Sequence, residues 1–169
     1  MDLFVDRMPS PIGALLLVWQ SSTLRALSFD DREERLRRWL RLHYGVLRLA
    51  TERAPEVIRA PIGAYFYGEI TAIDRILVHA HGTPFQRQVW AALREIPAGS
   101  TTTYGALAVR LGRSGASRAV GLANGSNPVA IVVPCHRVIG ANGALTGYGG
   151  GIDRKRWLLE HERGGVLGL

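Results

Sequence analysis

One stretch limits the possible folds of this chain more than any other. An apolar run over residues 129–133 ends at Pro134, and Cys135, His136 and Arg137 follow directly. The run has the length of a buried strand, and proline ends a strand because it cannot donate to the ladder. The next side chains then lie in a turn, where a thiol beside an imidazole and a guanidinium has a stabilised anion. The sequence therefore predicts a nucleophilic cysteine, although a small buried side chain of structural use stays open as the alternative.

Cys135 is the only cysteine among 169 residues, which excludes an internal disulfide and a thiolate-rich zinc site. His79 and His81 have the spacing of a metal pair, but no further ligands lie nearby in sequence, so we expect no metal. An unpaired thiol suits a reducing compartment, and the composition is that of a soluble globular protein. No apolar stretch is long enough to span a bilayer, and Asp2 and Asp6 do not suit a signal peptide.

The net charge of +7 is unevenly distributed along the chain. Residues 1–84 carry 11 arginines and 10 acidic residues, a balance of +1. Residues 85–169 carry 10 basic and 4 acidic residues, a balance of +6. A basic half that contains the cysteine suggests a polyanionic partner, nucleic acid first, although a solvated basic face needs no partner.

The first half predicts strands and two helices. A hairpin is expected over 14–29, with its turn at Ser21-Ser22, followed by a helix through Tyr44 that Asp30 or Asp31 caps. The arginines and glutamates of that helix have the spacing of ion pairs on a solvated face. A second helix is expected over 55–67, broken or restarted at Pro61, and strand character returns over 70–79.

The second half predicts four helices around a glycine-rich loop. Thr83 and Pro84 are the expected cap and first residue of the first helix. Two short helices follow over 104–111 and 115–124, the outline of a helix-turn-helix, a pattern that ordinary helical hairpins share. A loop over 141–151 leads to the last helix, 152–161, and residues 163–169 are expected to fray.

Five ordered motifs in this chain resemble those of the O6-alkylguanine-DNA alkyltransferase family. They cover residues 82–162 densely, while the first half matches mainly through Ser10-Pro11-Ile12-Gly13 and 65–69. The motifs are Gly82-Thr83-Pro84-Phe85-Gln86-Arg87-Gln88-Val89-Trp90, Thr103-Tyr104-Gly105, Arg118-Ala119-Val120-Gly121, Asn127-Pro128 with Pro134-Cys135-His136-Arg137-Val138, and Thr146-Gly147-Tyr148-Gly149-Gly150-Gly151.

The resemblance implies an α+β fold with two domains. Residues 1–81 would form a supporting α/β domain of ribonuclease H-like type. Residues 82–169 would form a mainly helical domain for DNA binding and alkyl transfer, with a winged-helix-like helix-turn-helix. The implied partner is double-stranded DNA that contains alkylated guanine, bound by a monomer in the cytoplasm of a prokaryotic type of cell. Cooperative binding along DNA stays open, and neither a membrane nor a cofactor is implied.

The resemblance also implies a mechanism, direct reversal of DNA damage by a protein that acts once. A flipped O6-alkylguanine, or O4-alkylthymine, would lose its alkyl group irreversibly to Cys135. His136 would take the thiol proton through a water, and Glu162 would orient the imidazole. Tyr104 would supply a proton to the departing base, and Asn127 would brace the cysteine turn.

Further residues take their expected roles from the resemblance alone. Arg118 matches the arginine that fills the vacated base stack, although an ordinary phosphate contact is the alternative. Mammalian relatives carry proline at the position of Ala130 and serine at that of Gly149, which puts tolerance of bulky alkyl groups in doubt. The other residues implied at the DNA interface are Ser117, Ala119 and Thr103, and those implied in the substrate pocket are Val138, Tyr148, Gly149, Ala130 and Pro134.

Two other functions remain to be distinguished from alkyl transfer. A lesion sensor would flip the base without chemistry, but such relatives lack the cysteine. A cysteine hydrolase would use Cys135 and His136 through many turnovers, but the sequence offers no evident oxyanion site.

Overall fold

The computed structural model describes residues 2–45 and 48–164. Contacts between residues divide the chain into two compact units. Unit 1 holds the residues up to His81 together with Pro128–Val132, and unit 2 holds Gly82–Asn127 together with the residues from Val133 onward. Strands and helices occur in both units, so the expectation of a mixed α and β fold is confirmed.

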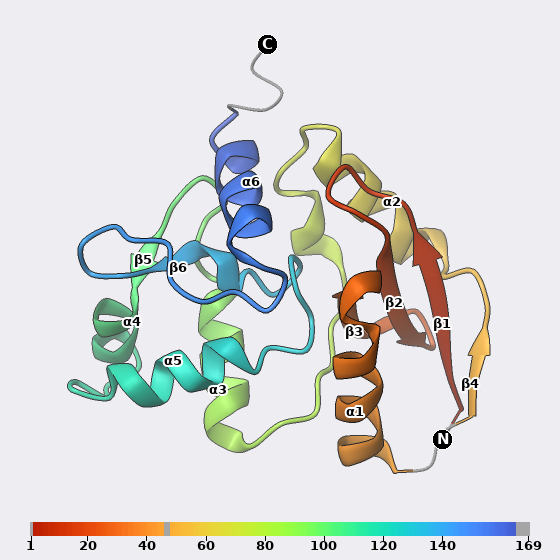
Figure 1. Ribbon diagram of the computed structural model, residues 1–169, viewed down its shortest axis with the longest axis horizontal. Helices are drawn as coiled ribbons and strands as arrows, with labels where there is room; N and C mark the ends of the chain where they lie inside the picture. The colour runs from red at the N-terminus through yellow and green to blue at the C-terminus, as the bar shows by residue number, and fades with distance from the viewer. Residues whose placement is uncertain (1, 46–47, 165–169) are drawn as a thin grey trace. The chain divides into compact units, whose positions relative to one another are not determined.

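Unit 1 is built on a four-stranded sheet with the strand order β3-β2-β1-β4 (Figure 1). β1 pairs antiparallel with β2 and parallel with β4, and β2 pairs antiparallel with β3. The elements of this unit are β1 (Asp2–Met8), β2 (Leu15–Gln20), β3 (Thr23–Phe29), η1 (Asp30–Arg32), α1 (Glu33–Tyr44), β4 (Arg48–Thr51), α2 (Glu56–Phe66) and η2 (Ala72–Arg75).

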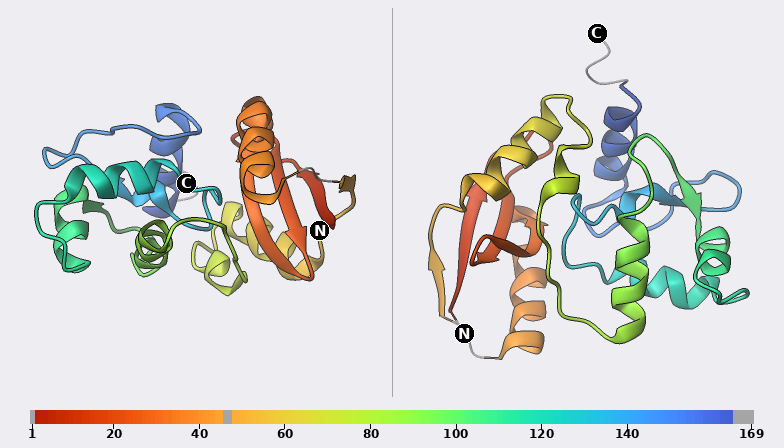
Figure 2. Two further views of the ribbon diagram at one scale, coloured as in Figure 1. Left: turned by 90° about the horizontal axis from the view of Figure 1, so that it is seen from below. Right: turned by 180° about the vertical axis from the view of Figure 1, so that it is seen from behind.

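The predicted hairpin is confirmed, and its turn follows from local backbone chemistry. Ser21 and Ser22 both have positive φ angles, 50° and 62°. Two-residue hairpin turns use such angles because they match the right-handed twist of the two strands that they join. Residues 15–18 of β2 are all buried, as expected of a central strand covered on both faces. Helices α1 and α2 lie on opposite faces of the sheet in the views of Figures 1 and 2.

One face of the sheet forms a core with α1. Leu36 and Leu40 of the helix are buried against Leu3, Leu16 and Val18 of the strands. These positions repeat every four residues in the helix and every two in β2, the periods of the two structures. The solvent face of α1 carries the predicted ion pairs, with Arg37 3.1 Å from Glu33.

Several predictions for unit 1 are wrong. Residues 70–79 form η2 and an isolated bridge between Leu24 and Val78 instead of a strand. No side chain caps α1, because its N-cap residue is Arg32 and the predicted caps, Asp30 and Asp31, lie in the preceding 3-10 turn η1. Helix α2 runs through Pro61 without a break.

The apolar run before Cys135 is also not a strand. Val129 makes one isolated bridge with Leu27, and residues 130–132 then form turns in which Ile131 has φ 72°. Residues 129–133 are buried except for Ala130, which is partly exposed. A short apolar run indicates burial without specifying the backbone conformation, so the prediction of burial was largely right and that of a strand was not.

Unit 2 is mainly helical, with one short parallel pair of strands (Figure 1). Its elements are α3 (Pro84–Leu93), β5 (Thr102–Thr103), α4 (Tyr104–Arg110), α5 (Ser117–Gly125), η3 (Cys135–Arg137), β6 (Val138–Ile139) and α6 (Ile152–Glu162). All four predicted helices of this half are present. Of the expected frayed end, residues 165–169 lie outside the described ranges.

Helix α3 begins as predicted, at Thr83 and Pro84. The Thr83 hydroxyl accepts from the Gln86 amide at 3.1 Å, and the Gln86 side chain accepts from the Thr83 amide at 2.9 Å. This capping box satisfies two of the amides that a helix start leaves unpaired. The indole of Trp90 donates to the Ala123 carbonyl at 2.9 Å and so joins α3 to α5.

The parallel pair β5–β6 brings the start of α4 close to the end of the cysteine turn. Thr102 pairs with Val138, and Thr103 pairs with Ile139. The Thr103 side chain then caps α4 by accepting from the Ala106 amide at 3.1 Å. Tyr104 is therefore placed by the same short sheet that follows Cys135.

Candidate active site

Cys135 opens the 3-10 turn η3 and is 7% exposed. Its amide donates to the Val133 carbonyl at 2.8 Å, which tightens the chain at Pro134. The Asn127 side chain donates to the same carbonyl at 2.8 Å. Asn124, a buried residue that the sequence analysis did not select, lies 3.4 Å from the Cys135 carbonyl through its Nδ2. Asn124 in the last turn of α5 and Asn127 just after the helix thus hold the turn that presents the thiol.

Behind the cysteine, His136, Arg137 and Glu162 form a buried network. The His136 Nε2 lies 2.7 Å from Glu162 Oε2. Arg137 donates from Nε to Glu162 Oε1 at 2.8 Å and from Nη2 to Oε2 at 3.0 Å, a two-pronged pairing. Its Nη1 donates to the Ile96 carbonyl at 2.7 Å. The predicted neighbours His136 and Glu162 are therefore brought together, although 26 positions separate them.

The charges of this network follow from burial and from Arg137. Burial by itself raises the pKa of the Glu162 carboxyl, but His136 and the Arg137 guanidinium outweigh it and hold that pKa well below its usual range. Arginine is charged at any ordinary pH, so the carboxylate is ionised whether or not His136 is protonated. Burial lowers the pKa of His136, and the attraction of Glu162 opposes that fall only in part. At neutral pH we therefore take His136 as a neutral imidazole beside a carboxylate.

The hydrogen bonds also assign the tautomer of that imidazole. An ionised carboxylate only accepts hydrogen bonds, so the Nε2 that faces Glu162 carries the proton. The other ring nitrogen, Nδ1, is buried and has no hydrogen-bond partner among the described residues. It therefore has a lone pair available to accept a proton.

Lys155 is a second buried cation that the sequence analysis did not select. It is 0% exposed, and its Nζ donates to the Val138 carbonyl at 2.7 Å and to the Thr146 carbonyl at 2.6 Å. Burial lowers the pKa of Lys155, and interaction with Cys135 opposes the fall. Arg137 and Glu162 offset one another, so a Cys135 thiolate would balance the charge of Lys155. One signal was present in the sequence, because Lys155 is the only lysine in a chain that otherwise uses arginine.

The glycine-rich loop carries two of the predicted residues, Tyr148 and Gly149. Tyr148 is partly exposed, but its hydroxyl oxygen is buried. Burial, and after it the charge of Cys135, raise the pKa of Tyr148 well above its usual value. The phenol is therefore neutral and close enough to the thiol to interact with it. Gly149 is exposed, and Pro134 and Val138 are buried on either side of the cysteine turn.

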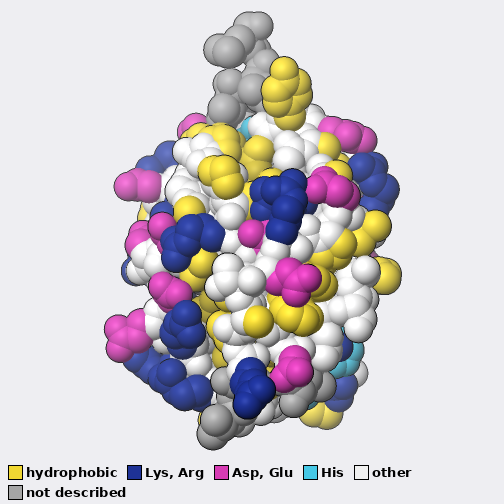
Figure 3. Space-filling view, turned by 90° about the vertical axis from the view of Figure 1, so that its right-hand side faces the viewer, with side chains coloured by type: hydrophobic (Ala, Val, Ile, Leu, Met, Phe, Trp, Pro, Cys, Tyr) yellow, Lys and Arg dark blue, Asp and Glu magenta, His cyan; other side chains and the backbone are white. Residues whose placement is uncertain are grey.

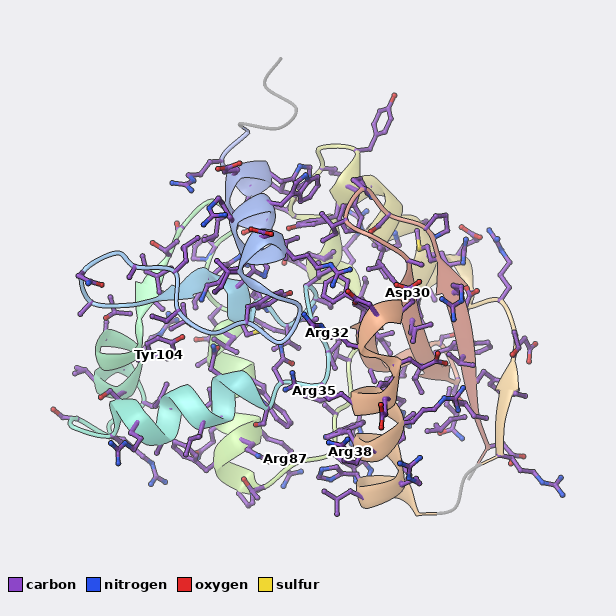
Figure 4. The ribbon with its side chains drawn as sticks, viewed as in Figure 1. Asp30, Arg32, Arg35, Arg38, Arg87 and Tyr104 are labelled. Carbon is purple, nitrogen blue, oxygen red and sulfur yellow. The ribbon has the colours of Figure 1, made fainter. Side chains whose placement is uncertain are left out.

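Tyr104 stands at the start of α4, partly exposed (Figure 4). Its hydroxyl lies 3.1 Å from the Thr146 hydroxyl, so the phenol meets the glycine-rich loop. Ala130 belongs to the segment Pro128–Val132 of unit 1, whereas Cys135 belongs to unit 2.

The exposed side of α5 carries the residues predicted for DNA. Ser117, Arg118 and Ala119 are exposed, and Leu122 on the same helix is 72% exposed. No acidic residue occurs between Glu95 and Asp153 in the sequence. This surface has small, apolar and basic side chains, which suits close approach to a polyanion.

Two kinds of site receive no support from the described residues. Among residues 2–45 and 48–164, no group of three or more potential ligands could hold a metal ion. None of the helices described in the structure combines the length and apolarity needed to cross a bilayer.

The fold and the site define a class of protein in which a pair of short helices with basic side chains, α4 and α5, accompanies a single cysteine. The histidine next to that cysteine is hydrogen-bonded to a buried glutamate. Comparison with known proteins narrows this class. Residues 84–164 match the family described as 6-O-methylguanine DNA methyltransferase, DNA binding domain. The chain is 47% identical over 164 residues to the methylated-DNA–protein-cysteine methyltransferase of Salmonella typhimurium, covering 95% of each chain.

Solved structures agree with the sequence matches. The O6-methylguanine methyltransferase of Mycobacterium tuberculosis superposes with a TM-score of 0.82 at 44% identity, over 95% of this chain and 93% of that one. The same bacterium's enzyme in complex with DNA superposes with a TM-score of 0.82 at 45% identity, over 95% and 92% of the two chains. This chain belongs to the methylated-DNA–protein-cysteine methyltransferase family.

Proposed function

We propose that this chain repairs O6-alkylguanine in duplex DNA, and O4-alkylthymine with it, by irreversible transfer of the alkyl group to Cys135. The observation that carries the proposal is the His136–Glu162–Arg137 network directly behind the only cysteine. Each chain would act once, because the thioether that forms is no longer a nucleophile. No cofactor is needed, since the thiol itself is the acceptor.

The network supplies the base that the thiol needs. Free cysteine has a pKa near ~8.5, so most of it is protonated at neutral pH. The unpartnered Nδ1 of His136 accepts the thiol proton through a bridging water, and Glu162 stabilises the imidazolium that results. Lys155 adds a nearby positive charge that favours the thiolate.

The transfer step then balances as a displacement at the alkyl carbon. The thiolate of Cys135 forms the new S–C bond as the bond from that carbon to the guanine oxygen breaks, and the electron pair moves into the base. A proton from the Tyr104 hydroxyl neutralises the departing guanine. The phenolate then takes a proton from water, and the His136 imidazolium returns the former thiol proton to the solvent, so that protons and charge balance. Asn127 holds the turn through the Val133 carbonyl while the sulfur reacts.

The DNA would be bound by unit 2. Helices α4 and α5 would act as a helix-turn-helix of winged-helix-like type, with α5 in a groove. Ser117 and Ala119 would allow close approach of the helix to the DNA, and Thr103 would contact the DNA backbone. Arg118 would fill the gap that the flipped base leaves in the base stack. Extruding that base costs a few kcal/mol. The chain would bind as a monomer in the cytoplasm, with residues 1–81 as a supporting, ribonuclease H-like domain.

The flipped base would lie beside the cysteine turn and the glycine-rich loop. Main-chain groups at Val138, Tyr148 and Gly149 would form hydrogen bonds with the edge of the flipped base. Pro134 and Ala130 would complete the lining of the pocket that holds it.

A single-turnover assay tests this proposal. The protein is mixed with a duplex that contains O6-methylguanine, and the tryptic peptide 119–137 is weighed by mass spectrometry. One methyl per chain on Cys135 is the expected result, and Cys135→Ala should bind the duplex without repairing it. Unmodified Cys135 beside either repaired or unrepaired DNA would exclude alkyl transfer, and repeated turnover on an ester would indicate a hydrolase.

A further inference from the structure

Tyr104 is held at both ends of its side chain. Its ring packs on the backbone of α5 at Gly121, where an added Cβ would lie 3.6 Å from Cδ1 and 3.8 Å from Cε1. Its hydroxyl lies 3.1 Å from the hydroxyl of Thr146. The packing places the ring, but only the contact with Thr146 gives the phenolic O–H bond a direction.

Thr146 is itself held from the interior of unit 2. The Thr146 carbonyl accepts from Lys155 Nζ at 2.6 Å, and the same Nζ donates to the Val138 carbonyl at 2.7 Å. Val138 pairs with Thr102 in the short sheet that leads directly into Tyr104. These contacts close a ring of interactions from Tyr104 through Thr146, Lys155 and Val138 back to β5. Thr146 thus occupies a fixed position in an otherwise glycine-rich loop.

We propose that Thr146 is a positioning residue that aims the Tyr104 hydroxyl at the departing base, an inference that rests on the proposed function. Two hydroxyls in contact share one proton between their oxygens, so one must donate and the other accept. If Thr146 donates to the phenolic oxygen, the phenol's own proton points away from the loop and toward the base. The same hydrogen bond stabilises the negative charge that develops on the phenolic oxygen as its proton leaves.

The proton is conserved through this step. The O–H bond of Tyr104 breaks as an N–H bond forms on the ring of the departing guanine. The Thr146 hydroxyl keeps its own proton throughout and strengthens its hydrogen bond to the phenolate. Water returns a proton to Tyr104 once the base has left. Thr146 therefore acts on the reaction only through Tyr104.

A double-mutant cycle tests the role of Thr146. Thr146→Val keeps the shape of the side chain and removes the hydroxyl, Thr146→Ser restores it, and Tyr104→Phe removes the group on which Thr146 acts. The rate of methyl transfer from an O6-methylguanine duplex is measured in single turnover, together with the Kd of each variant for that duplex. Thr101→Val, at an exposed threonine before β5, is the matched control.

We expect Thr146→Val to slow transfer roughly two- to tenfold, the range for one hydrogen bond, with Kd unchanged. Thr146→Ser should recover the rate, and Thr146→Val should have no further effect when Tyr104→Phe is present. Equal losses in the two backgrounds, or no loss at all, would overturn the positioning role while the wild-type chain still methylates Cys135. A wild-type chain that leaves Cys135 unmodified would instead overturn the proposed function, and this inference with it.

Discussion

The two units bury different kinds of side chain. In unit 1 the one polar residue classed as buried among those described is Asp6, which accepts from Arg59 at 2.5 Å and from the Ala54 amide at 2.9 Å. In unit 2 the buried polar residues are Asn124, His136, Arg137, Lys155, His161 and Glu162. Buried charges are expensive unless they are paired. Unit 1 uses its one pair to join β1 to α2, whereas unit 2 gathers several charges around a thiol.

The surfaces of the two units also differ in how their charges are arranged. The face in Figure 3 lies on the β1 and β4 side of Figure 1 and carries basic and acidic side chains interspersed. Arg32, Arg35 and Arg38 follow one side of α1 (Figure 4), and acids accompany them on the same helix. Unit 2 instead presents α5 without an acidic neighbour in sequence. In unit 1, basic side chains with acidic neighbours keep the surface soluble. In unit 2, the excess of basic side chains can attract a negatively charged partner.

Removing one carboxylate from each unit should give the largest contrast. Glu162→Gln leaves Arg137 buried with half of its pairing lost, and we expect a loss of about 3–5 kcal/mol in unfolding free energy together with much slower methyl transfer. Asp6→Asn should cost less, because the Arg59 side chain is 13% exposed and can reach water. Hydrogen exchange measured peptide by peptide resolves the two units, and the single-turnover assay measures transfer.

The outcome has a clear signature in each unit. Glu162→Gln should speed exchange in η3 and α6, and Asp6→Asn should speed it in β1 and α2 with the rate of transfer unchanged. A transfer defect in Asp6→Asn as large as that in Glu162→Gln would show that the division of labour between the units is wrong.

The chemistry of the site was easier to predict than the backbone that carries it. Cys135, His136 and Glu162 could be selected because their residue types and order match a family, and the structure brings the last two together. Residues 129–133 were misassigned as a strand because an apolar run specifies burial, while Ile131 takes a positive φ that no pattern of hydrophobicity encodes.

Two residues that act through long-range hydrogen bonds were hidden from the sequence. Thr146 and Asn124 are ordinary residue types in a loop and a helix, and their partners lie 42 and 11 positions away. The capping box of α3 could be predicted because both its members lie within one helical turn. Local chemistry can be predicted from the sequence, whereas long-range hydrogen bonds made by residues of ordinary type cannot.

Acid should weaken unit 2 in two separate ranges of pH. Burial lowers the pKa of His136 in the folded state, so the unfolded chain binds more protons below pH ~6.5 and folding stability is lost as the pH falls through that region. The pKa of Glu162 is also lowered, so its share is lost below about pH 4.5. Transfer should slow over the first range as well, because a protonated His136 cannot accept the thiol proton.

His136→Gln separates these two contributions. Its unfolding free energy is measured by urea titration at each pH. This free energy should no longer depend on pH near 6.5, but it should still fall below about pH 4.5, where Glu162 becomes protonated. Equal curves for the variant and the wild-type chain would mean that His136 does not titrate as the buried network requires.

The smallest expected effect concerns the surface of α5. If Arg118 contacts a phosphate, Arg118→Ala should lower the slope of log affinity against log salt by about 0.9. If it fills the vacated base stack, the slope should barely change while transfer slows, because flipping loses a stabilising contact. Arg38→Ala in unit 1 is the matched control, since that guanidinium is exposed and 3.9 Å from Glu34. A slope that falls equally in both variants would mean that DNA contacts the two units alike, against the contrast in their surfaces.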